Sequence, residues 1–87
     1  MLHDLKMARD SLDLHGYKTE DVEAVLDRFL VQLSSSSLKR ARILTGKGTG
    51  AVKAVVIRYL KLAGYNWIYE KQSNGKPNEG CLVIILD

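Results

Sequence analysis

The stretch RARILTGKGTGAVKAVVIRYLKLAG, residues 40–64, joins a strand pattern, a glycine loop and a helix pattern in direct succession. RARILT has the length and composition of a short strand. After the loop, apolar side chains recur every three or four residues, which is the spacing of one helix face. They are Val52, Val55, Val56, Tyr59, Leu60 and Ala63, and Gly64 follows as a stop signal. The stretch therefore predicts a strand, a tight loop and an amphipathic helix.

The residues before this stretch show a similar arrangement. In SLDLHG, residues 11–16, apolar and polar side chains alternate as in a short strand, and Gly16 ends it. A helix pattern follows, with Thr19 as its N-cap and the serine run at residues 34–37 as its end. Its apolar face consists of Val22, Val25, Leu26, Phe29, Leu30 and Leu33. Residues 1–10 lack a clear period, so we expect a leader or linker before a folded domain at residues 11–87.

Two more strand patterns complete the chain. They are YNWIYEKQ, residues 65–72, and CLVIILD, residues 81–87, joined by the turn-rich SNGKPNEG. The order is βαβαββ, and the simplest packing is an α/β two-layer sandwich with two helices on one face of a four-stranded mixed sheet. CLVIILD carries apolar residues for both faces, which predicts a well-covered strand in which Cys81 packs and is no nucleophile.

Three aromatic side chains alternate along one predicted strand and therefore share one of its faces. They are Tyr65, Trp67 and Tyr69. One interpretation is that they form the core beneath the helices, since a small domain has few other large side chains. The other is that they stack on unpaired nucleic-acid bases.

Composition limits the class of protein. Eighty-seven residues with 46% hydrophobic content predict one compact domain whose binding site lies on its surface. No apolar run approaches the roughly 20 residues of a membrane-spanning helix, so we expect no membrane partner. The single cysteine, Cys81, excludes an internal disulfide, and His3 and His15 alone cannot build the usual zinc site. A reducing, cytoplasmic setting is the expectation.

Charge is divided unevenly along the chain. Residues 1–37 contain four basic and seven acidic side chains, whereas residues 38–87 contain nine basic and three acidic ones. A basic second half favours an anionic partner such as nucleic acid, although such a bias also occurs on surfaces that only face water.

The two most polar motifs should meet in space. A strand, a crossover helix and a second strand form a parallel pair with a right-handed connection in nearly all known cases. The residues that emerge at the carboxyl ends of these strands are DLHG at 13–16 and TGKGTG at 45–50. Ligands of open α/β sheets tend to bind at this edge.

The glycine loop has two interpretations. Gly46, Gly48 and Gly50 permit close backbone approach, the next helix supplies free amides, and Lys47 adds a cation, so the loop is a candidate cradle for one backbone phosphate. Alternatively, the glycines serve only a tight turn that needs positive φ angles. Neither GxxxxGK[ST] nor GxGxxG is present, so we expect no nucleotide cofactor.

Asp13 and His15 flank Leu14 and should project to the same side of an extended segment. A carboxylate and an imidazole together can orient water, exchange a proton or hold a divalent ion. The alternative is structural, with the Asp capping a loop and the His closing hydrogen bonds at the strand end. Tyr17, next to this motif, is the aromatic residue that we expect nearest to a ligand.

Together these motifs resemble a known family. SLDLHGYKTEDVEAVLDRFL, RARILTGKGTGAVKAVVIRYL and GCLVIILD are similar, in this order, to the Smr (small MutS-related) domain across residues 11–87. That family has an LDLHG-type motif, an HGKGTG-type loop and a glycine before its last strand. The resemblance implies nucleic-acid binding, nicking endonuclease activity on DNA or RNA, and a parent chain that includes a MutS-type ATPase.

The resemblance also implies roles for single residues. Asp13 and His15 match the family's LDLHG and become candidates for phosphodiester cleavage. Nucleic-acid contacts fall on the glycine loop, its neighbour Lys53, and Tyr17; the loop residues are Thr45, Gly46, Lys47, Gly48, Thr49 and Gly50. The family's histidine at the first loop position is Thr45 here, and threonine cannot act as a general base at neutral pH.

Three functions therefore remain open from the sequence, the third being a purely structural domain that mediates protein contacts. The first is a nuclease that hydrolyses DNA, or RNA or branched structures, with Asp13 and His15 as its catalytic residues. Mg²⁺ is a candidate cofactor, but no metal ligand can be named, because only Glu20 and Asp21 lie near Asp13 in the chain. The second is a docking module without catalysis that brings a larger protein to DNA, RNA or the ribosome.

Overall fold

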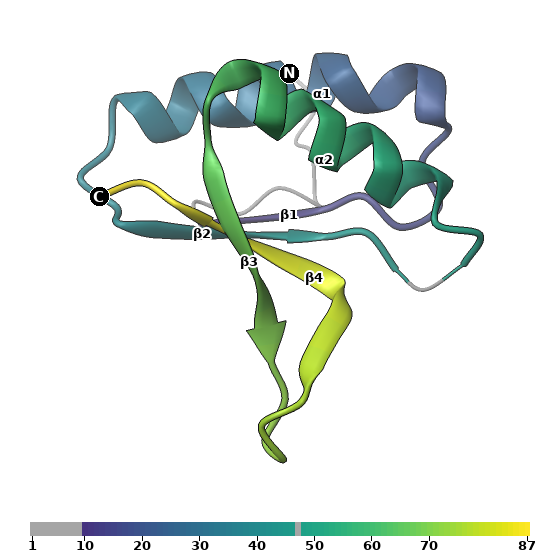
Figure 1. Ribbon diagram of the computed structural model, residues 1–87. Helices are drawn as coiled ribbons and strands as arrows, with labels where there is room; N and C mark the ends of the chain where they lie inside the picture. The colour runs from purple at the N-terminus through teal and green to yellow at the C-terminus, as the bar shows by residue number, and fades with distance from the viewer. Residues whose placement is uncertain (1–9, 47) are drawn as a thin grey trace.

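A computed structural model describes residues 10–46 and 48–87 of the chain. The elements are β1 (Ser11–Asp13), α1 (Thr19–Ser34), β2 (Arg40–Leu44), α2 (Ala51–Ala63), β3 (Asn66–Lys71) and β4 (Pro77–Ile85). This confirms the predicted βαβαββ order. Figure 1 shows both helices on one face of the sheet, as predicted for a two-layer sandwich. Within the described part of the chain, neither helix is long and apolar enough to cross a membrane.

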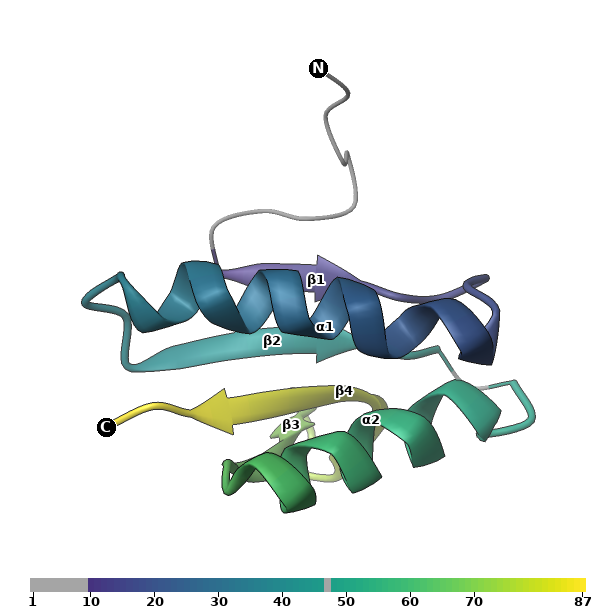
Figure 2. The ribbon, with the colours of Figure 1, turned by 90° about the horizontal axis from the view of Figure 1, so that it is seen from above.

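The sheet has the order β1-β2-β4-β3. β1 pairs with β2 in parallel, with Leu12 opposite Ile43, and the other two pairings are antiparallel. In Figure 2, α1 lies along β1 and β2, and α2 runs on the side of β4. Both helices follow strands that end at the same edge of the sheet, so the predicted parallel pair and its mixed sheet are confirmed.

The core lies between the sheet and the helices. It consists of Leu12, Leu14, Val22, Leu26, Phe29, Leu30, Leu33, Ala41, Ile43, Val56, Leu60, Leu82 and Ile84. Every second residue of β2 and β4 points into this layer because side chains alternate along a strand. Tyr65, Trp67 and Tyr69 are half-buried and pack against it, and the last two rings meet edge to face with centroids 5.0 Å apart. Their placement favours the core interpretation over a platform for bases.

The helix ends agree with the sequence at two of three points, and the first is that α1 ends at Ser34, where the serine run begins. Gly64 ends α2 in the left-handed region at φ 81°, as predicted, and its N–H and that of Tyr65 close the last turn. The prediction of Thr19 as the N-cap of α1 was wrong. Lys18 holds the extended capping position, and Thr19 is already helical. Because no side chain caps this end, Glu20 and Asp21 provide the negative charge that offsets the dipole.

The second face of β4 is less covered than predicted. Leu82 and Ile84 are fully buried beneath the helices, but Val83 and Ile85 point to the other face and are only half-buried. Both helices lie on the same side of the sheet (Figure 1), so this face of the central strand is left without a second layer of helices. The apolar run predicted that other elements cover both faces of this strand. In the part of the chain that the structure describes, helices cover one face of the mixed sheet.

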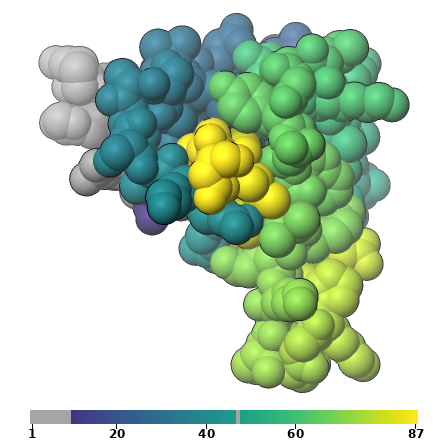
Figure 3. Space-filling view, turned by 60° about the vertical axis from the view of Figure 1, so that its left-hand side comes forward, coloured from purple at the N-terminus to yellow at the C-terminus, as the bar shows by residue number. Residues whose placement is uncertain are grey.

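The last hairpin extends further than predicted, because β4 begins at Pro77 and residues 77–80 belong to the strand rather than the turn. A proline is compatible with the first residue of a strand. The turn itself is closed by the Gln72 N–H, which donates to the Lys76 carbonyl over 2.8 Å. The pairing of β3 with β4 shifts between Tyr69 and Glu70. Beyond this shift, residues 70–78 form a hairpin arm that projects from the sheet (Figures 1 and 3).

Cys81 lies on β4 opposite Leu44 and is 2% exposed. Burial raises the pKa of its thiol above the ordinary 9.0, with the nearby Arg42 charge acting in the opposite direction. The folded state therefore holds this proton more tightly than the unfolded state. This contribution to stability is complete below the unfolded pKa and is lost as pH rises through the folded pKa.

We expect the free energy of unfolding to fall between pH of about 8 and about 10 by more in the wild type than in Cys81→Ala. The variant is the control because the tyrosines and lysines that also titrate at high pH are shared by both proteins. Denaturant titrations in reducing buffer measure the difference. Equal pH dependence in the two proteins would show that the thiol contributes nothing.

Candidate functional site

The carboxyl ends of β1 and β2 lie side by side, as the parallel pairing predicted. The Leu14 N–H donates to the Leu44 carbonyl over 2.7 Å, which aligns the two chains as they leave the sheet. A Cβ atom added to Gly46 would lie 3.3 Å from the Cβ atom of His15. The predicted contact between the DLHG motif and the glycine loop is therefore confirmed.

Asp13 and His15 form a hydrogen-bonded pair at this edge. Asp13 Oδ1 lies 2.8 Å from His15 Nδ1 and also accepts the His15 backbone N–H over 3.1 Å. The His15 side chain is 66% exposed and that of Asp13 33% exposed. The carboxylate thus fixes both the backbone and the ring of His15, while most of the ring still faces solvent.

This contact determines which ring nitrogen carries the proton. A carboxylate accepts hydrogen bonds, so Nδ1 carries the proton that it donates to Asp13. In the neutral ring the lone pair then lies on Nε2, and an imidazole in this form can take a proton from water. The pair has the chemistry that the sequence predicted for Asp13 and His15; its catalytic role stays a prediction.

The glycines of the loop differ in what they do. Gly46 and Gly50 have φ angles of 77° and 85°, which L side chains rarely adopt, so the turn itself requires both. Gly48 has no such angle, and a Cβ added to it would meet nothing within 4 Å. The turn interpretation therefore accounts for two of the three glycines and leaves Gly48 unexplained. Lys47, the predicted cation of the loop, lies outside the described residues.

The amino end of α2 faces the same loop. Its N-cap is Gly50, which offers no side-chain acceptor, and the first turn contains no acidic residue. The Ala51 N–H has a local side-chain partner, Thr49 Oγ1 at 3.3 Å. The first amides of a helix have no carbonyl partner within it and stand at the positive end of its dipole. This is the arrangement that binds phosphate groups at helix ends.

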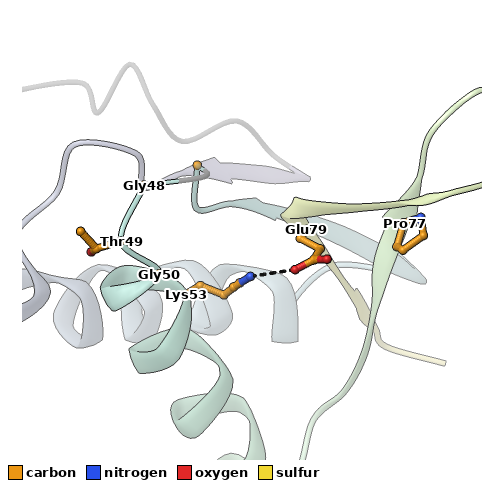
Figure 4. A pocket seen from close by; sticks show the side chains of 7 residues that line it. Gly48, Thr49, Gly50, Lys53, Pro77 and Glu79 are labelled. Atoms are coloured by element: carbon orange, nitrogen blue, oxygen red, sulfur yellow. Dashed lines mark hydrogen bonds and ion pairs between the residues drawn. The ribbon is translucent and has the colours of Figure 1, made fainter.

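A surface hollow of about 410 Å³ opens beside the loop. Gly48 and Gly50 form one wall, Pro77 and Glu79 of β4 form the opposite wall, and Lys53 of α2 lies between them (Figure 4). Lys53 Nζ lies 3.5 Å from Glu79 Oε1 and 5.5 Å from the centre of the Tyr69 ring. Lys53 was predicted to contact a phosphate. In the structure its ammonium group already contacts a carboxylate and an aromatic ring.

Pro77 and Glu79 were not predicted to take part in the site. The sequence assigned both to a turn, so they had no expected position near the glycine loop. A smaller hollow on the other side of the loop is bordered by His15 and Gly16. The loop therefore separates the Asp13–His15 pair from the β4 wall.

Thr45 and Tyr17 lie deeper than the loop glycines. Thr45 is 7% exposed, and its hydroxyl is directed at the carbonyl oxygens of Gly46 and Gly80, 3.4 and 3.5 Å away. Tyr17 is half-buried against the core, and its N–H donates to the Leu14 carbonyl over 3.0 Å. Their predicted nucleic-acid contacts stay predictions.

The described residues do not fit a Mg²⁺ site made by the protein alone. No group of three or more His, Cys, Asp or Glu side chains comes together among residues 10–46 and 48–87. Asp13 already binds His15, whereas Glu20 and Asp21 are exposed in the first turn of α1. Mg²⁺ usually takes one or two carboxylates along with substrate phosphates.

Sequence comparison identifies relatives over the whole domain. A model of the Smr domain family matches residues 12–87. Endonuclease MutS2 of Fusobacterium nucleatum is 27% identical over 84 residues, covering 97% of this chain and 11% of that protein. Endonuclease MutS2 of Exiguobacterium sibiricum is 33% identical over 79 residues, covering 91% of this chain and 10% of that protein. The chain thus spans about a tenth of these relatives.

Solved structures show the same fold. The Smr domain of Thermus thermophilus MutS2 superposes with a TM-score of 0.74 at 24% identity, covering 90% of this chain and 98% of that one. YdaL, a stand-alone small MutS-related protein from Escherichia coli, gives a TM-score of 0.77 at 19% identity, covering 92% and 66%. With the family model matched from β1 to the end of β4, the chain belongs to the Smr domain family.

Proposed function

We propose that the chain is a nucleic-acid-binding nicking endonuclease domain that hydrolyses phosphodiester bonds in DNA. The observation that carries this proposal is the contact between two motifs. An oriented imidazole, His15, stands next to a glycine loop that leads into the bare amino end of α2. A phosphate held by the loop would therefore lie beside a group that can move a proton. The name of the MutS2 relatives, endonuclease, supports the same activity.

Binding depends on backbone groups. The amides at the start of α2 would donate to the phosphate oxygens, and Gly48 would let the sugar-phosphate chain approach closely. Charge-assisted hydrogen bonds of this kind are short and about twice as strong as neutral ones. Because these contacts reach only the backbone of the nucleic acid, they carry no sequence preference.

Cleavage would proceed by attack of water on phosphorus. His15 accepts a proton from the water, the new P–O bond forms, and the bond to the leaving sugar oxygen breaks as that oxygen takes a proton from solvent. The α2 amides stabilise the charge that builds up on the phosphate oxygens. Asp13 acts as a positioning residue, since it holds Nδ1 and stabilises the imidazolium.

The experiment measures nicking of supercoiled plasmid and binding of labelled duplex by the wild type and Gly48→Val. The wild type should nick the plasmid. The substitution should weaken binding about tenfold to hundredfold, because a lost charge-assisted hydrogen bond is worth ~1.5–3 kcal/mol. It should leave stability within about 0.5 kcal/mol, since Gly48 has neither a positive φ nor a close neighbour.

Ser37→Val is the matched control, because it adds a similar apolar group at an exposed position before β2, at the opposite end of that strand. Undiminished binding by a folded Gly48→Val protein would refute the phosphate cradle. Binding without any nicking by the wild type would refute the nuclease and leave a docking module.

A docking module is the second candidate, and the position of Thr45 favours it. The family's histidine would stand here, but this chain has a buried hydroxyl that contacts the Gly80 and Gly46 carbonyls. Under this proposal the domain binds DNA, RNA or the ribosome for a larger parent chain that includes an ATPase. Binding would then weaken with salt, and no nicked product would form.

A further inference from the structure

The hairpin arm, residues 70–78, contributes nothing to the core. Its sequence is EKQSNGKPN, in which proline is the only apolar residue. Residues 71–77 are all exposed. The space-filling view shows the arm standing clear of the rest of the molecule (Figure 3). Packing of the domain therefore does not explain why the strands continue past the sheet.

The arm is nevertheless well ordered by its own contacts. Near the tip, Gln72 donates its backbone N–H to the Lys76 carbonyl and its side-chain Nε2–H to the Pro77 carbonyl. The Lys76 N–H donates to Asn74 Oδ1 over 3.0 Å. At the base, Arg42 of β2 binds Glu70 at two points. Its Nε lies 2.7 Å from Oε2, and its Nη2 donates to Oε1 over 3.0 Å. An arm braced at both ends loses little conformational freedom when it binds a partner.

The exposed charge on the arm is positive. Arg42 neutralises Glu70, and this hydrogen bond raises the pKa of the guanidinium above its ordinary value, so the pair stays ionised. Lys71 and Lys76 are exposed and form no ion pair with any residue that the structure describes. Two exposed lysines on a polar hairpin are suited to binding a polyanion such as nucleic acid.

The arm begins where the phosphate cradle ends. Pro77 of the arm and Glu79, which directly follows the arm, line the same hollow as Gly48 and Gly50 (Figure 4). A phosphate held at the amino end of α2 therefore lies at the foot of the arm, and the nucleic acid would have to pass along it.

We propose that the hairpin arm enters the major groove of duplex DNA while Lys71 and Lys76 contact phosphates beside that groove. This inference rests on the proposed function. The major groove of B-form DNA is about 12 Å wide and about 8.5 Å deep and admits a two-stranded ribbon. The arm has three paired positions beyond the sheet, Glu70 with Asn78, Lys71 with Pro77 and Gln72 with Lys76. They reach roughly 10 Å, enough to meet the floor of the groove. A-form RNA has a narrow major groove that side chains cannot enter.

The first test is the salt dependence of binding to a labelled DNA duplex. Each phosphate contact contributes about 0.9 to the slope of log K against log salt. Lys71→Gln with Lys76→Gln should therefore lower the slope by about 1.8. Between 50 and 200 mM salt, wild-type affinity should fall about twelvefold more than that of the variant. The matched control is Lys39→Gln with Lys61→Gln, two exposed lysines at the ends of β2 and α2 away from the loop.

The second test probes the groove directly. Guanine N7 lies in the major groove, so wild-type protein should protect it from methylation by dimethyl sulfate. A variant in which residues 72–76 are replaced by a two-residue Asn-Gly turn should lose the protection. Folding of this variant is checked by circular dichroism and thermal unfolding. The salt-dependence test with the Lys71 and Lys76 variant keeps the full-length arm, so it does not depend on the shortened variant.

The outcomes separate this inference from the proposed function. A wild-type slope in the Lys71 and Lys76 variant, or guanines that react freely in the complex, would overturn the groove contact while the Gly48→Val effect stands. Equal affinity for an RNA duplex, with the same loss in the lysine variant, would also overturn it. A wild type that binds no DNA at all would instead remove the proposed function.

Discussion

Replacing His15 by alanine should reduce plasmid nicking by about 10²- to 10⁴-fold, the contribution typical of a positioned general base. Binding of duplex DNA should change much less, because the phosphate is held by the loop and α2. The fold should also be retained, since the ring is 66% exposed. Asp13→Asn should lower nicking to a similar degree for another reason: its amide can donate to Nδ1, which moves the ring proton to Nε2 and removes the base.

Glu23→Gln is the charge-matched control for Asp13→Asn. It neutralises one carboxylate in an exposed ion pair with Arg58 on the helical layer, with atoms 3.5 Å apart. Such surface pairs contribute about 0–1 kcal/mol, so neither nicking nor folding should change. Nicking rates are compared at saturating protein and equal salt. A folded His15→Ala domain that nicks as fast as the wild type would exclude His15 from the chemistry and leave the source of any cleavage elsewhere.

Gly46→Ala should reduce nicking, but by less than the roughly 10²-fold that a 1 Å misplacement of a catalytic group can cause, because a shift of a few tenths of an ångström relieves the new contact. Two costs arise at this position. The alanine backbone would have to keep the φ of 77° that Gly46 has, which destabilises the fold by roughly 1–2 kcal/mol. The new Cβ would also lie 3.3 Å from the His15 Cβ, so His15 has to move away from the cradle.

Gly64→Ala separates the two costs. Gly64 has a φ of 81°, but a Cβ added there meets nothing within 4 Å, and it ends α2 far along the helix from the loop. We expect the two variants to lose similar stability in denaturant titrations, while only Gly46→Ala loses activity at a temperature where both are folded. An equal loss of activity in both would mean that strain alone is responsible.

The fold was largely predictable because its elements have strong local signals. Apolar spacing located both helices, and Gly64 marked the end of α2. The handedness of a strand-helix-strand unit then placed the DLHG motif beside the glycine loop. Two local errors have a physical cause. The N-cap position at Lys18 depends on backbone direction rather than side-chain type, and the extension of β4 to Pro77 depends on pairing with β3.

The site was predictable in its motifs but not in its contacts. The spacing of Asp13 and His15 placed them on one side of the chain, yet their 2.8 Å hydrogen bond depends on the turn that follows β1. No local pattern links Lys53 with Glu79 or Arg42 with Glu70, because these pairs join strands and helices that are distant in the sequence. The shift in pairing that directs the hairpin arm is likewise a property of two strands together.

The exposure of His15 and the open space around Gly48 have a consequence for how such a domain can change over generations. Neither residue belongs to the apolar layer between sheet and helices, so substitutions at these two positions destabilise the fold little. Under the proposed function, a substitution of His15 abolishes cleavage while the protein still folds and still binds a phosphate through main-chain amides. Selection can therefore move a lineage between cutting a nucleic acid and merely holding it in a single step, with no unfolded intermediate form.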